Sequence, residues 1–456
     1  MEFIELVKAG DIESAYELLT SKEGVKDHAK EFDNDRNVRE TQVGKRPIKT
    51  TKDGDVKVSR IPIPFQRQIV KTASTFLFGS PVKLIERKSE SDDEAYKSVL
   101  NLWDDLRLDP LLLKFCKAVK SETEASIIFH AVKSSTDEET KIKAKLITSD
   151  NGKVFPVFDA FGDMVAFGWE YVIKENEKDV KYLYIFTAET NYAFKTESKE
   201  WEMAEDYPKP NLFKKIPVVY LSQKYPEWWE VQEMIDTFEM SFSKFVDTNG
   251  YFASPMYKVT GAVKSFPKPD DTAKLIKLDI VETDKGNVIQ SDLEVISWDR
   301  APESLKLEFE TNKGLIYGLT DTPDLSFDNV KNLGNISGIA LKLMFLGPIL
   351  KAKEGEGDYQ IVISRIINIL KSGIGNINNT GLNKKLEELR VDVTFTSVLP
   401  ENIKEVIGIL SEATAGKPIM SQKTAVANNP LVQDNDEELL NIESEIILDL
   451  GATETL

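Results

Sequence analysis

The sequence predicts an α+β protein of several domains, and two observations lead to this prediction. Strand-like runs with short turns between them fill 124–225, and helical patterns flank that region on both sides. A second, smaller β region at 251–300 lies between two further helices. Because the turns between strands are short, the strands are expected to pair antiparallel. The length of 456 residues is enough for about three domains.

Residues 1–120 are predicted to be mainly helical. Residues 2–20 have a helical pattern that Gly10 and Asp11 interrupt, whereas 21–60 are polar and are expected to form an extended or irregular arm. The residues before Pro62 and Pro64 are expected to be extended, since proline disfavours helical geometry in the residue that precedes it. Further helices are predicted at 65–78, 93–106 and 110–120.

The larger β region is expected to form one antiparallel meander. Its strands are predicted at 127–132, 141–148, 165–173, 180–187 and 192–195. Turn sequences such as Asp150-Asn151-Gly152 separate these strands.

A helical hairpin with a β tip is predicted from 226 to 318. Apolar residues recur at steps of three and four along 226–249, and Gly250 is expected to end that helix. Pro302 favours the start of a second helix, which Gly318 is expected to end. Strands between the helices are predicted at 256–259, 274–279, 287–289 and 293–296. The helices carry more apolar surface than one neighbour covers, so they pack either against further copies of the chain or inside a monomeric core.

The C-terminal part is predicted to be helical with one strand. Ser337 is placed to cap a helix at 338–350. The glycine-rich segment 373–381 is expected to be a loop, and the tail from 421 to consist of short helices with an acidic surface. Other helices are predicted at 358–372, 382–389 and 402–413, and a strand at 391–395.

The net charge of −18 argues against a conventional DNA-binding protein, because phosphate contacts need a basic surface. The charge is compatible with a protein that surrounds DNA without holding it. An acidic surface around the DNA would repel the duplex only within a Debye length, about 8–10 Å in physiological salt. The other interpretation is that the acidity only keeps the protein soluble.

Cysteine content and hydropathy indicate the cellular compartment in which this protein is made. Cys116 is the only cysteine, so no disulfide within the chain is possible and a reducing cytoplasm is indicated. Residues 1–10 lack the pattern of a signal peptide. The best candidate for a membrane segment, 339–350, is too short to span a bilayer.

Enzyme signatures are absent from the sequence. The chain contains His28 and His130 as its only histidines, which disfavours a histidine-based metal cluster or a Ser-His-Asp triad. Gly416-Lys417 is followed by Pro418 where a phosphate-binding loop needs Ser or Thr. No spacing of Asp and Glu stands out as a metal site, and no cofactor is expected.

Four short motifs, in order, resemble phage portal proteins of the siphovirus type. PFQRQIVK at 64–71 and FLFGSPV at 76–82 resemble the wing segment of that family, although Lys71 and Ser80 depart from its usual residues. GNISGIALK at 334–342 is similar to the element where the tunnel loop enters the tunnel helix. The other similar segments are IPVV at 216–219 with MIDTF at 234–238, and LPEN at 399–402 with MSQKTA at 420–425 and NPLV at 429–432.

The resemblance implies a portal fold assembled as a ring. It consists of a wing of antiparallel β-structure and helices, a helical stem, a small β clip and a C-terminal helical crown. The implied boundaries are an N-terminal arm at 1–60, wing at 61–225, stem helix at 226–250, clip at 251–300, second stem helix at 301–320, tunnel loop and tunnel helix at 321–357, wing return at 358–420, and crown or tail at 421–456.

The resemblance also implies a function. About twelve chains would form a homo-oligomeric ring at one capsid vertex of a virion, assembled in the host bacterial cytoplasm. Double-stranded DNA would pass through the ring without base reading, and no membrane or ATP hydrolysis would be involved. The implied partners are the terminase large subunit, a head-completion or adaptor protein, the scaffold and the major capsid protein. The residues expected to face DNA are Asn329, Lys331, Asn332, Asn335, Ser337 and Lys342.

Two alternatives remain open on the sequence. The first is a phage DNA-processing enzyme whose metal is held by scattered carboxylates; it predicts monomers or small oligomers with metal-dependent turnover. The second is another virion protein such as a tail adaptor, although such proteins are usually much shorter. The loop residues named above could equally be ordinary solvated side chains.

Overall fold

The computed structural model describes most of the chain and divides it into two compact units. The first unit contains 1–323 and 350–396, and the second contains 324–349 and 397–456. The described residues are 2–20, 31–32, 43–51, 54–87, 93–133, 140–175, 177–198, 200–252, 256–260, 262–265, 277–279, 281–282, 288–289, 292–296, 302–324, 343–396, 398, 403–432, 435 and 437–444.

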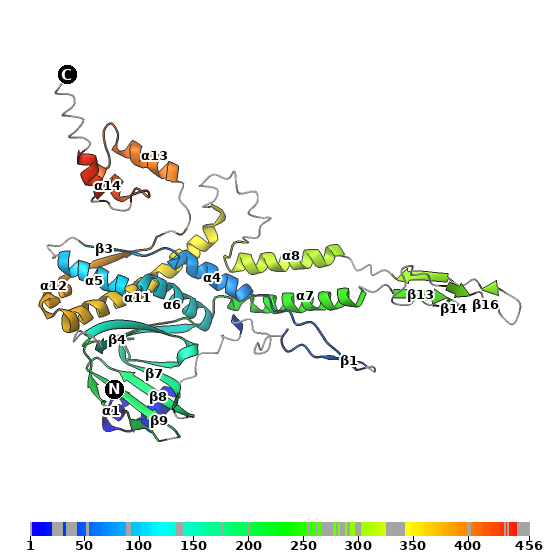
Figure 1. The fold of residues 1–456 in the computed structure, drawn as a ribbon, viewed down its shortest axis with the longest axis horizontal. Coiled ribbons are helices and arrows are strands. Elements are labelled where there is room, and N and C mark those ends of the chain that lie inside the picture. Colours follow the sequence, from blue (N-terminus) through cyan, green and yellow to red (C-terminus); the bar gives the residue numbers. More distant parts are fainter. Residues whose placement is uncertain are drawn as a thin grey trace. The chain divides into compact units, whose positions relative to one another are not determined.

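The largest core of the first unit lies between helices and a three-stranded sheet. The sheet has the order β12–β4–β5 and is antiparallel (Figure 1). Its strands are β4 (Glu124–Lys133), β5 (Thr140–Ile147) and β12 (Val218–Ser222). Helices α4 (Phe65–Phe78), α5 (Asp93–Asp105), α6 (Leu108–Glu122) and α11 (Leu346–Gly373) bring buried side chains to one face of it. Phe115, Ile127, Phe129 and Ile366 are fully buried there.

A second sheet covers the other face of the first. Its main path is β10–β9–β8–β7–β6, and β11 (Lys209–Pro210) pairs with β9. The other bounds are β6 (Lys153–Phe158), β7 (Met164–Glu175), β8 (Lys178–Phe186), β9 (Thr190–Thr196) and β10 (Glu202–Met203). Phe167 and Phe186 of this sheet join Ile128 and Val218 of the first sheet in one buried cluster. The strands therefore form a two-layered β-structure.

Helices α1 (Glu2–Ala9) and α2 (Ile12–Thr20) pack on the remaining face of the second sheet (Figure 1). Ala15 and Leu19 are buried against Leu183 and Phe194. Tyr16 donates its hydroxyl hydrogen to Glu170 at 2.7 Å. The helical pattern of 2–20 and its break at Gly10 are confirmed, but the sequence did not predict that this segment packs on a sheet.

Two long helices run side by side and are joined by a β region (Figure 1). They are α7 (Gln232–Phe252), preceded by a 3-10 turn at Trp229–Val231, and α8 (Pro302–Leu319). Strand β13 (Met256–Thr260) pairs with β18 (Asp292–Ile296), so both ends of the β region lie together. Between them, β14 (Ala262–Ser265) pairs with β15 (Lys277–Asp279), and β16 (Val281–Glu282) pairs with β17 (Val288–Ile289). The predicted helical hairpin with a β insert is confirmed.

The end of α11 leads into a π-helical turn and back to the first part of the unit. Ile374–Asn378 form the π turn, followed by a 3-10 turn at Thr380–Leu382 and α12 (Asn383–Glu388). Strand β19 (Val391–Thr394) then pairs antiparallel with β3 (Lys83–Glu86). A two-stranded hairpin, β1 (Lys49–Thr51) with β2 (Gly54–Val56), completes the described strands of this unit. The second unit contains α13 (Ile403–Thr414) and α14 (Gln422–Ala427).

Several predicted boundaries are wrong for physical reasons. The single meander is two sheets, because β12 returns to pair with β4 while β6–β10 form their own layer. Strand β6 was missed because it contains Pro156, which an edge strand tolerates. Gly250 and Gly318 do not end their helices, since an isolated glycine costs only about 1 kcal/mol relative to alanine in a helix.

Helix boundaries near the C-terminal end also differ from the prediction. The two helices predicted around 338–372 correspond in the described part to one continuous helix, α11, which includes Gly355 and Gly357. The predicted loop at 373–381 is the π turn and the 3-10 turn instead. The predicted strand at 391–395 and helix at 402–413 are confirmed within one residue where described. The α+β fold class is confirmed. No helix in the described part of the chain combines the length and apolarity needed to cross a bilayer.

Candidate functional site

The predicted DNA-facing residues lie outside the described part of the chain. Asn329, Lys331, Asn332, Asn335, Ser337 and Lys342 all fall within 325–342. On the N-terminal side the description reaches Asp324, five residues beyond the end of α8, and it resumes at Leu343. The candidate site described below is therefore the junction formed around the described residues that directly precede and follow this range.

A buried carboxylate organises the junction. Glu227 lies between β12 and α7, and its side chain is only 9% exposed. Its Oε2 is 2.8 Å from Nζ of Lys120 in α6, and its Oε1 is 2.7 Å from Nζ of Lys351 in α11. Its backbone N–H donates to the carbonyl of Lys120. One carboxylate thus joins three segments that are far apart in the sequence.

The electrostatics of this group favour its ionised form. Burial alone would raise the pKa of Glu227, but the ammonium groups of Lys120 and Lys351 outweigh burial and hold the pKa below its usual range. Ion pairs whose charges are withdrawn from water are costly to break, because the remaining charge is left without a partner. Glu227 therefore acts as a fixed anion that holds two lysines.

Lys351 also holds the C-terminal end of α8. Its Nζ donates to the carbonyl of Thr320 at 2.9 Å, directly after the helix ends. A cation near a helix C-terminus interacts favourably with the unpaired carbonyls there. The Thr320 side chain is buried, and its Oγ1 donates to the carbonyl of Ile316 and lies 3.0 Å from Oγ1 of Thr322. The start of the segment 321–342 is consequently anchored to α11 and, through Glu227, to α6.

An extended segment lies along α7 and uses its backbone to bind it. The N–H groups of Ser59, Ile61 and Ile63 donate to side chains four residues apart on α7. The acceptors are Asp247 at 2.8 Å, Ser243 at 3.0 Å and Glu239 at 2.7 Å. Donors two residues apart can meet acceptors four residues apart because alternate residues of an extended chain face the same way, and so do residues at steps of four along a helix.

Aromatic side chains fill the space between α7 and α8. The ring of Phe309 lies 5.3 Å from that of Phe238, 5.8 Å from Phe242 and 5.9 Å from Phe245. Phe65 of α4 contacts Phe238 and Tyr317 edge to face. These contacts fix the helical pair to α4, since aromatic pairs add about 0.5–1.5 kcal/mol beyond their buried area.

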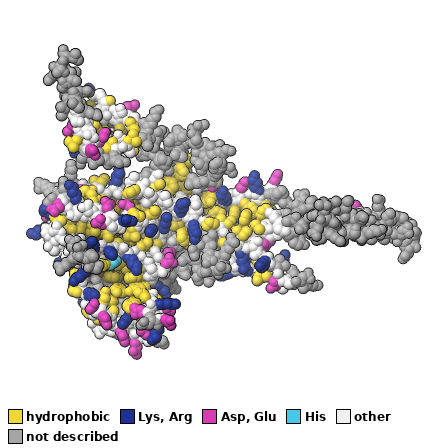
Figure 2. Space-filling model, in the orientation of Figure 1, with side chains coloured by type: hydrophobic (Ala, Val, Ile, Leu, Met, Phe, Trp, Pro, Cys, Tyr) yellow, Lys and Arg dark blue, Asp and Glu magenta, His cyan; other side chains and the backbone are white. Residues whose placement is uncertain are grey.

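The helical pair still exposes apolar side chains. Leu307, Leu315 and Leu319 of α8 are 65%, 44% and 53% exposed. Their spacing of eight and four residues places them on one side of the helix. Figure 2 shows hydrophobic side chains gathered over the region of α4, α7 and α8. Such a face is typical of a surface that another chain covers.

Chemistry typical of an enzyme is sparse in the described residues. Within them, no group of three or more His, Cys, Asp and Glu side chains is placed to hold a metal ion. Burial and neighbouring Lys143 lower the pKa of His130, and burial raises the pKa of Cys116 to about 11. A thiol with such a pKa is a poor nucleophile at neutral pH. His28 lies outside the described residues.

Sequence reasoning missed the junction. The predicted helices at 110–120 and 226–249 contain Lys120 and Glu227, whereas Lys351 falls between two predicted helices. Nothing in their spacing connects them, because more than one hundred residues separate Glu227 from each lysine. The one local signal is an acidic residue between Pro226 and Trp228 at the entrance to a helix.

Comparison with known proteins defines the family to which this chain belongs. A helical hairpin with a β insert, following a β-rich wing, is the arrangement that the motifs predicted for a portal protein. The family model described as "Phage portal protein, SPP1 Gp6-like" matches residues 8–448. The chain belongs to this family of phage portal proteins. The family is a structural, non-enzymatic one.

Two individual similarities accompany the family match. The portal protein of Bacillus phage SPP1 is 23% identical over 258 residues, which cover 54% of this chain and 49% of that protein. The chain thus spans about half the length of this curated relative. A solved structure of the neck of an empty GTA particle, computed with C6 symmetry, contains a chain that is 10% identical, with a TM-score of 0.41. That match covers 88% of this chain and 91% of the other.

Proposed function

We propose that the chain is one subunit of a ring-shaped portal at a single vertex of a phage capsid, through which double-stranded DNA passes. The family match over residues 8–448 carries this proposal. In it, the proposed domain boundaries are those implied by the motifs: wing at 61–225, stem helices at 226–250 and 301–320, and clip at 251–300. The ring would contain about twelve chains, related by rotational symmetry.

The exposed leucines of α8 support the oligomeric part of the proposal. A ring needs a surface on each subunit that a neighbour covers, and Leu307, Leu315 and Leu319 supply an apolar one. The aromatic core between α7 and α8 leaves this face outside the helical pair. We therefore assign these leucines to the contact between adjacent stems.

Rings can be tested directly. Negative-stain imaging and native mass spectrometry of the purified protein should show closed rings with a central hole. The double substitution Leu307→Ser with Leu315→Ser should shift the protein toward monomers, whereas Glu308→Gln, also exposed on α8, should leave the rings intact. Failure to form rings in the presence of scaffold and capsid protein would overturn the proposal.

The segment 321–337 would form a tunnel loop at the channel. DNA passage needs weak contacts that are replaced as the duplex moves, and Asn329, Lys331, Asn332 and Asn335 have suitable side chains. Ser337 and Lys342 would lie where the loop enters the tunnel helix. Lys331→Gln and Asn335→Ala should reduce the amount of DNA packaged in an assay with complete capsids, and Lys174→Gln, an exposed lysine of β7, should not.

The remaining parts of the proposal concern partners and chemistry. The clip would dock the terminase large subunit during packaging and a head-completion or adaptor protein afterwards, while the wing would contact scaffold and major capsid protein. The chain would be a virion component assembled in the host cytoplasm, with no membrane partner and no cofactor. It would hydrolyse no ATP; purified rings without terminase should show no DNA-stimulated ATPase activity.

A further inference from the structure

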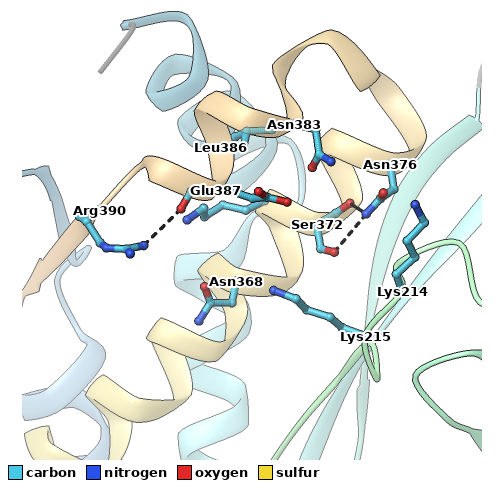
Figure 3. A pocket seen from close by; sticks show the side chains of 10 residues that line it. Lys214, Lys215, Asn368, Ser372, Asn376, Asn383, Leu386, Glu387 and Arg390 are labelled. Atoms are coloured by element: carbon cyan, nitrogen blue, oxygen red, sulfur yellow. Dashed lines mark hydrogen bonds between the residues drawn. The ribbon is translucent and has the colours of Figure 1, made fainter. Parts of the chain in front are cut away.

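A cationic pocket of about 420 Å³ lies at the end of α11, away from the junction at Glu227 (Figure 3). Its lining comes from three places in the first unit: the turn at 214–215, the last turn of α11 with the π turn, and α12 with the residues after it. Figure 3 shows Lys215 extending from one side toward Asn368, with Arg390 on the opposite side. The pocket is thus built by segments that fold together.

The lining has four cationic side chains and one carboxylate. The cations are Lys214, Lys215, Lys371 and Arg390, and the carboxylate is Glu387. Among the described residues, no carboxylate lies within ion-pair distance of any of the four. This surplus is opposite in sign to the net charge of the chain, −18.

Hydrogen bonds to backbone carbonyls use only some of the N–H donors of these cations. Lys371 Nζ donates to the carbonyl of Leu389 at 2.8 Å, and an Arg390 N–H donates to the carbonyl of Glu387 at 3.2 Å. An ammonium group has three donors and a guanidinium group five, so both retain free N–H groups. Burial, with Arg390 and Lys215 nearby, lowers the pKa of Lys371, and Glu387 opposes this only in part. The pocket is therefore short of negative charge.

The turn that carries Lys214 and Lys215 is held in a strained conformation. Lys214 has a φ of 52°, in the left-handed region that non-glycine residues rarely adopt. Buried Asn211 holds the turn: its side-chain amide donates to the carbonyls of Thr187 and Lys215, and its Oδ1 accepts from the N–H of Phe213. Strain retained by several surrounding contacts is common at binding sites.

The floor of the pocket is also rigid. Ser372 donates to the carbonyl of Phe213 at 2.6 Å, and Asn376 donates to the carbonyl of Ser372 at 2.8 Å. A Cβ built on Gly375 would lie 2.5 Å from Oδ1 of Asn383, so α12 approaches the π turn closely. The π turn is an uncommon element, frequently found at functional sites. The site is consequently formed before any ligand arrives.

The lining chemistry favours one class of anion. Lysine binds carboxylates and phosphates alike as a point charge, and the fork of Arg390 suits either anion, so the cations select an anion and the neighbouring amides decide its kind. Asn368 and Asn383 offer an amide donor and an acceptor each, which matches the peptide group. A volume of about 420 Å³ exceeds the space that a single phosphate needs.

We propose that this pocket binds an acidic peptide segment, with its carboxylates at Lys214, Lys215, Lys371 and Arg390 and its backbone at the asparagines. This binding does not depend on ring formation, so its failure and that of the proposed portal function are distinguishable. It predicts a contact site on the wing region for a protein partner that presents clustered Asp and Glu side chains.

A labelled peptide with the sequence of residues 433–445 of this chain is a suitable probe, since it carries six carboxylates and no cationic side chain. Fluorescence anisotropy with the full chain at low salt should show saturable binding that weakens as salt is added. Lys215→Gln should weaken binding about threefold to fivefold, and Lys215→Gln with Lys371→Gln and Arg390→Gln should abolish it, because each removes a charge partner. Lys174→Gln removes one exposed positive charge elsewhere and should leave the affinity unchanged.

Three results would overturn the proposal. Equal weakening by Lys174→Gln would show general attraction of charge, and equal binding of a peptide with Asn and Gln in place of Asp and Glu would show that carboxylates are not recognised. Absence of peptide binding, with pyrophosphate or a DNA oligonucleotide bound and sensitive to Lys215→Gln, would assign the pocket to phosphates instead. Because Lys215 is exposed, its substitution tests binding without loss of folding.

Discussion

The junction at Glu227 and the pocket at Lys371 both contain more cations than carboxylates, but only at the junction do the opposite charges form ion pairs. At the junction, one carboxylate satisfies two ammonium groups, and all three side chains are at most 21% exposed. At the pocket, four cations surround one carboxylate and the lining remains open to solvent. Paired and buried charges lock elements together, whereas accessible charges that form no ion pair are available to a ligand. The comparison separates a structural site from a binding site in one unit.

The largest expected effect is the loss of the carboxylate at the junction. Glu227→Gln leaves Lys120 and Lys351 without their counter-ion and should lower the free energy of unfolding by about 3 kcal/mol. Urea unfolding followed by tryptophan fluorescence measures this, because Trp228 is buried beside the site. Glu197→Gln, which breaks the exposed pair with Lys178, should cost about 0.5 kcal/mol or less. Equal effects of the two substitutions would contradict the comparison.

Acid should weaken the junction through the same group. The pKa of Glu227 is lower in the folded protein than in the unfolded chain, so the unfolded chain binds the proton more readily. Its contribution to stability is fully present above the unfolded pKa and is lost as the pH falls through the folded pKa. Unfolding measured between pH 7 and pH 3 should therefore show a steeper loss of stability for the natural chain than for Glu227→Gln. Parallel curves would exclude Glu227 as the group responsible.

Removing a cation from the pocket should not destabilise the fold, in contrast to removing the carboxylate from the junction. Lys215→Gln relieves repulsion among like charges and should leave stability unchanged or raise it by about 0.5 kcal/mol or less, since the group is exposed. The same variant should weaken the acidic peptide probe, a combination typical of residues kept for binding at a cost in stability. Thermal unfolding and anisotropy on one preparation give both values. Clear destabilisation by Lys215→Gln would make the pocket a structural cluster like the junction.

The smallest expected effect comes from the single acid of the pocket. Glu387→Gln removes the carboxylate that partly offsets the cations and should tighten the peptide about twofold to threefold. Glu388→Gln, an exposed neighbour outside the pocket lining, is the matched control and should change the affinity less. An unchanged affinity for Glu387→Gln would mean that this side chain points its charge away from the ligand.

Much of the local structure followed from the sequence. Helix α4 was predicted with the bounds that the structure has, because its apolar spacing, the preceding Ile-Pro pairs and the following Gly79 all agree. The hairpin of α7 and α8 followed in the same way from periodicity. The ends of α7 and α8 did not, since an isolated glycine such as Gly250 or Gly318 costs a helix only about 1 kcal/mol relative to alanine. The predicted DNA-facing residues at 329–342 lie outside the described residues and stay a prediction.

The sequence by itself determined most of the element types, the α+β class, the hairpin and, through four ordered motifs, the portal family, because helix and strand periods and short motifs are local. Only the tertiary structure decided the pairing of β12 with β4, the cover of α1 and α2 on the second sheet, and both charged sites. Glu227 pairs with Lys120 and Lys351, and Lys215 lines the same pocket as Arg390, in each case across more than one hundred residues. Such meetings depend on the packing of whole elements around a shared core, which no local pattern encodes.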